Sequence, residues 1–371
     1  MTVRRNNESF RNIIMESNYV NWELTASVKQ LLMQIHPLKY LFFELTQHCN
    51  LRCAHCGSRC PDYADRSELS AENYKSVVDR VAQAVPTNQL MFCITGGEPL
   101  LNKDWFEICS YITQKGFSWG MTSNGTLIDE VCVRRLAQAE MKTVSISLDG
   151  LKESHEQLRG VPGCFDQAVN AIRLLKNSGL FRAVQVVTVV NRLNYAELPR
   201  LYELVKSLNV DSWKLTPIEP MGKAKEVQGF FLSPGEHYQL LGFIKSKRQT
   251  APFEVTYGCS HLLPEEYDST VRKQPFLCGA GTMIASIASN GDILPCLDID
   301  CRDHVKQGNI LQDDFVDVWE NKFELFRRNK ANTSPTCRDC KLKQVCQGDS
   351  WHSWDFEENV PQVCFQKHIF F

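Results

Sequence analysis

The amino-acid sequence predicts an α/β protein in which a partial (β/α)6 barrel is followed by a small cysteine-rich α+β domain. Between about residues 40 and 230, short apolar runs alternate with longer segments of helical periodicity, a pattern typical of βα units. Three of the 16 cysteines follow the first apolar run directly, and most of the others lie in the C-terminal part. That part shows little regular periodicity, as expected where metal replaces part of a hydrophobic core.

The alternating region contains strand-like runs separated by amphipathic stretches. Connections between neighbouring parallel strands are right-handed, so six such units can close part of a barrel. In a barrel of this kind, functional groups collect at the C-terminal ends of the strands. The predicted strands are residues 41–45, 90–95, 119–122, 143–148, 183–190 and 212–215. The predicted helices include residues 71–84, 128–139, 165–175 and 197–208.

Two local signals organise the rest of the chain. Ser233-Pro234 has the N-cap and first-turn pattern of a helix that extends toward Arg248. Residues 283–288 and 292–294 flank Asn290-Gly291, a dipeptide that favours a tight β-hairpin. The predicted parts are an N-terminal helical extension (1–38), the barrel (39–232), a linking helix with a bridging segment (233–277) and the cysteine-rich domain (278–371).

Composition excludes several classes of partner. The formal net charge is -2 and the basic residues are interspersed with acidic ones, so we expect neither nucleic acid nor a membrane surface as a partner. No apolar run approaches the roughly 20 residues of a membrane helix, and no apolar signal core follows the N-terminus. We therefore expect a cytoplasmic protein, in which clustered cysteines are more often metal ligands than disulfides.

The most informative motif lies immediately after the first predicted strand. Cys49, Cys53 and Cys56 form a C-x3-C-x2-C pattern, so three thiolates can surround one compact metal centre. Iron–sulfur clusters normally take four thiolates, so a loop with three predicts an iron that is open to another ligand. Structural zinc is the alternative, although it prefers a closed tetrahedral set of ligands. A chance grouping of three cysteines is the remaining explanation.

Polar segments also follow the next predicted strands. Gly96-Gly97-Glu98-Pro99 combines two glycines that allow close approach of a ligand with a carboxylate that can receive an ammonium group. Ser123-Asn124 follows the third strand, and Ser147 with Arg159 follows the fourth. A guanidinium is suited to two-point pairing with a carboxylate. Each segment alone is compatible with an ordinary loop, but their recurrence after successive strands indicates a site.

The order of these motifs resembles the radical S-adenosylmethionine (radical SAM) superfamily. The resemblance implies a 4Fe-4S cluster on Cys49, Cys53 and Cys56 whose fourth iron binds the amino and carboxylate groups of S-adenosylmethionine. It further implies reductive cleavage of this molecule, a 5′-deoxyadenosyl radical that takes a hydrogen atom from the substrate, and an electron donor such as flavodoxin or ferredoxin. The residues implied in binding S-adenosylmethionine are Gly96, Gly97, Glu98, Ser123, Asn124, Ser147, Arg159, Thr188, Val190 and Asn191.

The C-terminal cysteines form a second pattern. Cys337, Cys340 and Cys346 are spaced C-x2-C-x5-C and Cys364 follows, while Cys278 and Cys296 bracket Gly291 as C-x12-G-x4-C. This resembles the SPASM domain, a C-terminal module that binds one or two auxiliary iron–sulfur clusters. A structural zinc site is the alternative for the C-x2-C-x5-C group.

One position departs from the SPASM pattern. Ser350 stands where the resemblance leads us to expect a cysteine of the first auxiliary cluster. The second cluster is complete in the sequence, with Cys337, Cys340, Cys346 and Cys364 as its implied ligands. The first has Cys278 and Cys296, and Cys259 and Cys301 are candidates for the remaining ligands. Otherwise this cluster keeps an open iron, is a 2Fe-2S cluster, or is absent.

The resemblance implies a peptide-modifying maturase that forms a crosslink or thioether, or that epimerises or oxidises a side chain. The alternatives are a dehydrogenase of a small molecule, a formylglycine-forming enzyme like the sulfatase maturases, and a non-catalytic iron–sulfur scaffold. Sulfatase-maturing relatives carry an aspartate directly after the cysteine that matches Cys296, whereas Leu297 stands there in this chain. Asp298 and Asp300 remain as candidate catalytic bases.

Overall fold

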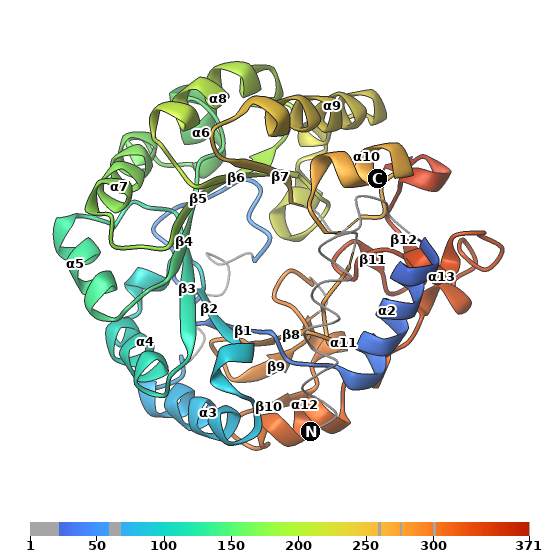
Figure 1. The fold of residues 1–371 in the computed structure, drawn as a ribbon, viewed down its shortest axis with the longest axis horizontal. Helices are drawn as coiled ribbons and strands as arrows, with labels where there is room; N and C mark the ends of the chain where they lie inside the picture. The colour runs from blue at the N-terminus through green and yellow to red at the C-terminus, as the bar shows by residue number, and fades with distance from the viewer. Residues whose placement is uncertain (1–21, 59–67, 259–260, 275–276, 300–301, 371) are drawn as a thin grey trace.

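The structure is a computed structural model, and it describes residues 22–58, 68–258, 261–274, 277–299 and 302–370. Its centre is a ten-stranded sheet that curves into an incomplete barrel, with helices around the outside (Figure 1). The six predicted strands are all present, and they pair in parallel in chain order. They are β1 (Tyr40–Glu44), β2 (Met91–Thr95), β3 (Ser118–Ser123), β4 (Thr143–Ser147), β5 (Ala183–Val190) and β6 (Ser212–Pro217).

The sheet is wider than predicted, because strands are added at both edges. β7 (Glu254–Tyr257) pairs in parallel with β6, within the segment predicted only as a bridge. At the other edge β8 (Ile284–Ile287) pairs in parallel with β1. The predicted hairpin is confirmed, because β8 pairs antiparallel with β9 (Asp292–Leu294), and β10 (Gly308–Asn309) extends it. The hairpin of the C-terminal part is thus continuous with the barrel sheet.

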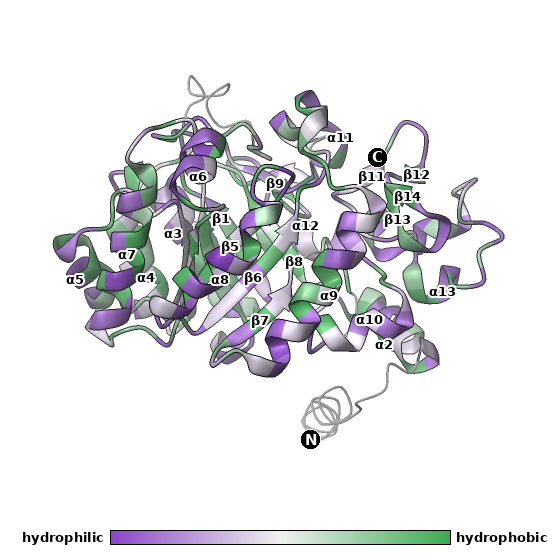
Figure 2. Cartoon of the chain, turned by 90° about the horizontal axis from the view of Figure 1, so that it is seen from above, coloured by the Kyte–Doolittle hydropathy of each residue, from purple (hydrophilic) through white to green (hydrophobic). Residues whose placement is uncertain are grey.

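Helices cover the outer face of the sheet. α3 begins with a capping box between Ser70 and Asn73, and the predicted helix after Ser233 begins with a capping box to Glu236. Hydrophobic and hydrophilic residues alternate around α5 and α7, whose apolar faces are buried (Figure 2). The helices around the barrel are α3 (Ala71–Ala84), α4 (Trp105–Gln114), α5 (Glu130–Gln138), α6 (Lys152–Arg159), α7 (Cys164–Ser178), α8 (Leu198–Ser207), α9 (Pro234–Thr250) and α10 (Glu265–Val271).

Large aromatic side chains fill the core between the sheet and the helices. Phe43, Phe92, Trp119 and Trp213 are fully buried, and the Trp119 indole donates a hydrogen bond to the Ala139 carbonyl at 2.8 Å. Burial alternates strictly along β5, as expected of a strand with one face toward the helices. Among the described residues, no helix has both the length and the apolar character needed to cross a membrane.

The C-terminal part consists of short elements joined by turns. Helix α2 (Trp22–Ile35), from the N-terminal extension, packs against it, and Lys29 donates a hydrogen bond to the Val345 carbonyl at 2.5 Å (Figure 1). The helix of the N-terminal extension thus packs on the C-terminal part, and the division of the chain into four parts stays a prediction. The elements are α11 (Arg302–Val305), α12 (Phe315–Asn321), α13 (Lys343–Cys346), β11 (Trp354–Asp355), β12 (Val360–Pro361), β13 (Val363–Cys364) and β14 (Ile369–Phe370).

Candidate functional site

The first cysteine loop follows β1 and is held by its backbone from two sides. The amides of Arg52 and Ala54 donate to the carbonyls of Arg159 and Leu158, at the end of α6, at 3.0 and 2.8 Å. On the other side, the amide of Lys223, after β6, donates to the Cys56 carbonyl at 2.9 Å. The loop that carries the three cysteines is therefore fixed before any ligand binds.

Gly96 and Gly97 are required by close packing against this same loop. The amides of Gly97 and Glu98 donate to the carbonyls of Thr46 and His48 at 2.8 and 2.9 Å. A Cβ atom on Gly97 would lie 2.3 Å from the His48 carbonyl oxygen, and one on Gly96 would lie 2.5 Å from that of Thr46. The two glycines thus bring the ends of β1 and β2 together, in addition to any role in ligand approach.

Glu98 is the buried centre of a hydrogen-bond network. Its carboxylate is fully buried and accepts from the Ser123 hydroxyl at 2.9 Å and from the Asn124 amide at 2.8 Å. The Asn124 side chain in turn donates to Asn50, beside Cys49, at 2.9 Å. Burial raises the pKa of Glu98 to about 7. An ammonium group placed here would stabilise the ionised carboxylate, so the residues fit the amino group of S-adenosylmethionine.

Arg159 lies between the cysteine loop and a buried carboxylate. Its Nη1 is 3.6 Å from Cys53 Sγ, and its Nη2 is 2.5 Å from Asp149 Oδ2. His55 Nε2 is 3.2 Å from the same oxygen. Burial opposes ionisation of Asp149, but Arg159 and His55 hold the pKa of its carboxyl below the ordinary value. A positive charge is therefore held beside a predicted cluster ligand, where it offsets thiolate charge.

The thiols of Cys49 and Cys53 are poor acids without a metal. Burial raises the pKa of Cys49 to about 11 and also raises that of Cys53, which Arg159 partly offsets. Metal binding must therefore supply the free energy that keeps these sulfurs deprotonated. Three cysteines on one fixed loop, with the Arg159 cation beside Cys53, are a donor set that fits a 4Fe-4S cluster.

The residues predicted to contact adenosine lie deeper in the sheet. Thr188 is fully buried; its hydroxyl donates to the Leu148 carbonyl at 2.7 Å and accepts from the Trp213 indole at 2.9 Å. Val190 and Asn191 are also fully buried, and Ser147 is half-buried. The structure does not bring these residues into the network around Glu98, and their roles stay predictions.

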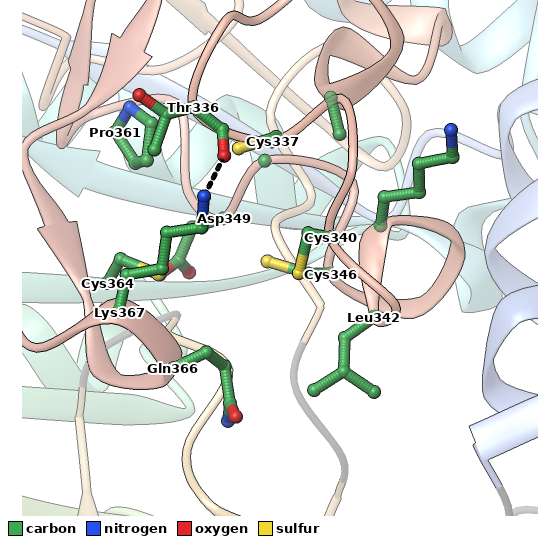
Figure 3. A pocket seen from close by; sticks show the side chains of 13 residues that line it. Thr336, Cys337, Cys340, Leu342, Cys346, Asp349, Pro361, Cys364, Gln366 and Lys367 are labelled. Carbon is green, nitrogen blue, oxygen red and sulfur yellow. Dashed lines mark hydrogen bonds between the residues drawn. The ribbon is translucent and has the colours of Figure 1, made fainter.

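Four cysteines of the C-terminal part line one pocket (Figure 3). Cys337 and Cys340 lie in the turns before α13, Cys346 is the last residue of that helix, and Cys364 lies on β13. Asp349 lines the same pocket. Burial raises the pKa of Cys346, and that of Cys364 to about 11. These four cysteines fit the predicted second auxiliary cluster, and four thiolates would also suit a zinc ion.

The ligands predicted for the first auxiliary cluster are described only in part. Cys278 lines a neighbouring pocket together with Lys29, Asp349 and Trp351. Cys296 is partly buried, and burial together with the charge of Asp298 raises its pKa; Asp298 itself is exposed. Cys259, Cys301 and Asp300 lie outside the described residues. Ser350 is fully buried, and its hydroxyl lies 2.8 Å from the hydroxyl of Ser353.

Two buried lysines near these cysteines were not predicted. Lys330 Nζ lies 4.0 and 4.5 Å from the ring centroids of Trp351 and Trp354 and has no hydrogen-bond acceptor among the described residues. Burial lowers the pKa of Lys330 and of Lys29 to about 8, although nearby cysteines and Asp349 oppose this. Cations held so close to sulfur ligands can balance the negative charge of a bound cluster. No sequence motif links these two positions.

A second unpredicted group consists of Glu219, His261 and His352. All three are buried or partly buried, and their ligand atoms lie within 4.8 Å of one another. They come from the segment after β6, the segment before α10 and the turn before β11.

Comparisons with known proteins agree with these sites. Residues 43–205 match the family model of the radical SAM superfamily, and residues 278–341 match that of the SPASM iron–sulfur cluster-binding domain. The AdoMet-dependent heme synthase of Methanosarcina barkeri is 28% identical over 327 residues, covering 84% of this chain and 90% of the relative. Mycofactocin maturase MftC of Mycobacterium tuberculosis is 31% identical over 315 residues, covering 83% and 77%.

Two solved structures share the fold. The structure of Streptococcus suis SuiB bound to precursor peptide SuiA has a TM-score of 0.71 and 19% identity, covering 91% of this chain and 78% of that one. The structure of anSMEcpe with bound AdoMet has a TM-score of 0.69 and 20% identity, covering 90% and 94%. These similarities confirm the predicted architecture of a partial barrel with a C-terminal cysteine-rich domain.

Proposed function

The chain belongs to the radical SAM superfamily, as a member with a SPASM domain, and from this premise we propose that it modifies a ribosomally made peptide. It is an enzyme whose cofactors are S-adenosylmethionine, a 4Fe-4S cluster and one or two auxiliary iron–sulfur clusters. The observation that carries the peptide assignment is the 31% identity to a mycofactocin maturase over 83% of this chain. The product would be a crosslink, a thioether, an epimer or an oxidised side chain.

The proposed roles of the residues in the first site follow from their contacts. Cys49, Cys53 and Cys56 would hold the cluster, which when bound supplies the electron for reductive cleavage of S-adenosylmethionine. The ionised carboxylate of Glu98 would receive the ammonium group of that molecule. Arg159, oriented by Asp149, would offset thiolate charge or pair with the carboxylate of S-adenosylmethionine.

An electron donor and a location complete the proposal. A small redox protein such as flavodoxin or ferredoxin would reduce the first cluster. We place the protein in the cytoplasm, because its many cysteines must stay reduced to act as ligands.

The test of the radical chemistry is production of 5′-deoxyadenosine. After anaerobic reconstitution and reduction with dithionite, the protein should release 5′-deoxyadenosine, and Cys53→Ala should abolish this release. Cys109→Ala is the matched control, because this buried cysteine lies on α4 and burial alone raises its pKa, and it should leave the release intact. Continued cleavage in the Cys53 variant would disprove the cluster assignment.

The test of the peptide assignment is co-expression with the short open reading frames that neighbour the gene. Mass spectrometry should show a defined mass change in one of these peptides, and the change should be absent with Cys53→Ala. If none is modified by a protein that is competent to release 5′-deoxyadenosine, the peptide assignment is wrong while the radical chemistry stands.

A second candidate is chemistry on an iron tetrapyrrole. It is favoured by the match to an AdoMet-dependent heme synthase, which covers 90% of that relative. Incubation with an iron porphyrin precursor of heme should then give a product with a changed mass and a changed Soret absorption. An unchanged tetrapyrrole in the presence of 5′-deoxyadenosine formation would eliminate this candidate.

A further inference from the structure

Two imidazole rings point at one buried carboxylate between the barrel and the C-terminal domain. His261 Nε2 lies 2.8 Å from one oxygen of Glu219, and His352 Nε2 lies 2.8 Å from the other. Side-chain exposures are 1% for His261, 3% for Glu219 and 15% for His352. The nitrogens and oxygens that could act as ligands are all within 4.8 Å of one another. Zinc binds ligands of these types at about 2.0–2.2 Å, so the three side chains would draw together around a bound ion.

A second carboxylate orients one of these rings. Asp349 Oδ2 lies 3.2 Å from His261 Nδ1, and its Oδ1 accepts hydrogen bonds from the amides of Leu262 and Ser350 at 3.2 and 3.0 Å. A proton on Nδ1 that is donated to Asp349 leaves the lone pair of Nε2 directed at Glu219. Histidines that bind metal ions are held by carboxylates in this way, because the contact sets the tautomer and makes the ring a better ligand.

The backbone that presents Asp349 adopts an unusual conformation. Gln347, Gly348 and Asp349 all have positive φ, at 59°, 88° and 70°. Left-handed conformations of residues other than glycine cost about 1–3 kcal/mol and concentrate at functional sites. The following residue is Ser350, which replaces the cysteine expected from the SPASM pattern, and its hydroxyl lies 3.3 Å from His352 Nε2. The turn that departs from the family pattern therefore carries Asp349 to His261 and His352 to Glu219.

The charges of the group favour a divalent cation. Two carboxylates with two neutral imidazoles carry a charge of about −2, and side chains this deeply buried require compensation. The positive charges of Lys29 and Lys330 also lie near Asp349. Both lysines lie near cysteine sulfurs as well, where their charge would balance the negative charge of bound clusters.

We propose that Glu219, His261 and His352 bind one divalent transition-metal ion, separate from the iron–sulfur clusters. Two imidazoles and one carboxylate form a ligand set suited to zinc and to ferrous iron, and they leave a coordination position for water or a substrate group. The ion joins two parts of the protein. The segment after β6 that carries Glu219 also packs on the first cysteine loop, because a Cβ on Gly222 would lie 2.3 Å from the Cys56 carbonyl.

The test is a metal count on the full-length protein, purified anaerobically with its clusters. Zinc, iron, manganese and cobalt are measured by mass spectrometry and acid-labile sulfide is measured in parallel, because cluster iron is matched by sulfide. We expect about one metal ion per chain beyond the cluster iron. Zinc should show only nitrogen and oxygen ligands at about 2.0–2.1 Å in X-ray absorption, and ferrous iron should give a separate high-spin Mössbauer doublet.

Variants locate the ion. Glu219→Gln and His352→Ala should each remove it, and Asp349→Asn should weaken its binding by about 10–100-fold in competition with a chelator. His304→Ala, which removes an exposed histidine from α11, should retain it. The spectra of the unaltered protein decide the question even if a variant does not fold. Zinc with sulfur ligands, or no metal beyond the iron matched by sulfide, would overturn the proposal.

Discussion

Replacement of Asp149 by Asn should strongly destabilise the barrel. Asp149 is fully buried, and its Oδ2 lies 2.5 Å from Arg159 Nη2 and 3.2 Å from His55 Nε2. Its Oδ1 accepts the Val189 amide at 2.8 Å, a bond that the asparagine carbonyl can preserve. The substitution therefore removes the charge while keeping the shape, and it leaves the Arg159 guanidinium buried without this counter-ion.

The expected cost is about 3–5 kcal/mol, the usual result of breaking a buried ion pair by removing one partner. Asp166→Asn is the matched control, because Asp166 lies at the same 2.5 Å from Lys152 but both side chains are more than half exposed, at 62% and 56%. A pair so exposed contributes about 0–1 kcal/mol. The comparison separates the effect of burial from the effect of distance.

Urea unfolding followed by tryptophan fluorescence measures the difference. For Asp149→Asn we expect the midpoint to fall by roughly 1 M, because the slope for a chain of this size is several kcal/mol per M. The folded-state pKa of Asp149 is depressed, so its stabilisation is complete above the unfolded pKa of about 4 and is lost as the pH falls below it. The difference in urea midpoint between the wild type and Asp149→Asn should therefore become smaller under acid conditions. A shift no larger than that of Asp166→Asn would refute the reasoning.

Three further predictions concern the cofactor sites. Glu98→Gln should weaken S-adenosylmethionine binding about tenfold or more, because it removes a charge-assisted hydrogen bond. Binding to the wild type should weaken as the pH falls below about 7, where Glu98 takes up a proton, and calorimetry at pH 6 and pH 8 measures both effects. Gly97→Ala should reduce the iron and sulfide bound by the first site, because the new Cβ would lie 2.3 Å from the His48 carbonyl oxygen. Gly229→Ala is the control: its Cβ would have no neighbour within 4 Å, so the measured iron and sulfide content should be unchanged. Lys330→Met should lower the midpoint potential of an auxiliary cluster by roughly tens of millivolts, because it removes a buried positive charge beside the cysteines, whereas Lys341→Met, at an exposed position, should not. Redox titrations followed by electron paramagnetic resonance measure the potential, and an unshifted value in Lys330→Met would show that Lys330 does not act on a cluster.

The sequence predicted the six central strands because each is an apolar run followed by an amphipathic helix, a local and repeated signal. It did not predict how the sheet is completed. β7 and β8 have four residues each, and β8 pairs with β1 across most of the chain, so no neighbouring pattern specifies its partner. Such long-range pairing is decided by burial in the assembled core, where Ala285 and Ile287 are fully buried.

The cysteine sites could be predicted because their ligands lie close together in the sequence, as Cys49, Cys53 and Cys56 do. The contacts of Arg159 were predicted only in part. A guanidinium was expected to meet a carboxylate of a ligand, and in the structure it meets Asp149 and Cys53, which the local pattern did not pair with it. Lys330 and His261 belong to sites built from segments that are distant in the sequence, and no spacing rule can find such sites.

Ser350 departs from the predicted cysteine pattern, and its neighbours in the structure were not predicted. A serine that replaces a buried cysteine ligand brings a hydroxyl group into the interior, and this hydroxyl needs hydrogen-bond partners. In this chain the Ser350 hydroxyl contacts Ser353 and His352, and the adjacent Asp349 contacts His261. Polar groups around the missing sulfur are therefore joined to Glu219 instead, at the side of the barrel that faces the first cysteine loop. Buried polar groups require hydrogen-bond partners, so these contacts account for a serine at this fully buried position whether or not the first auxiliary cluster forms.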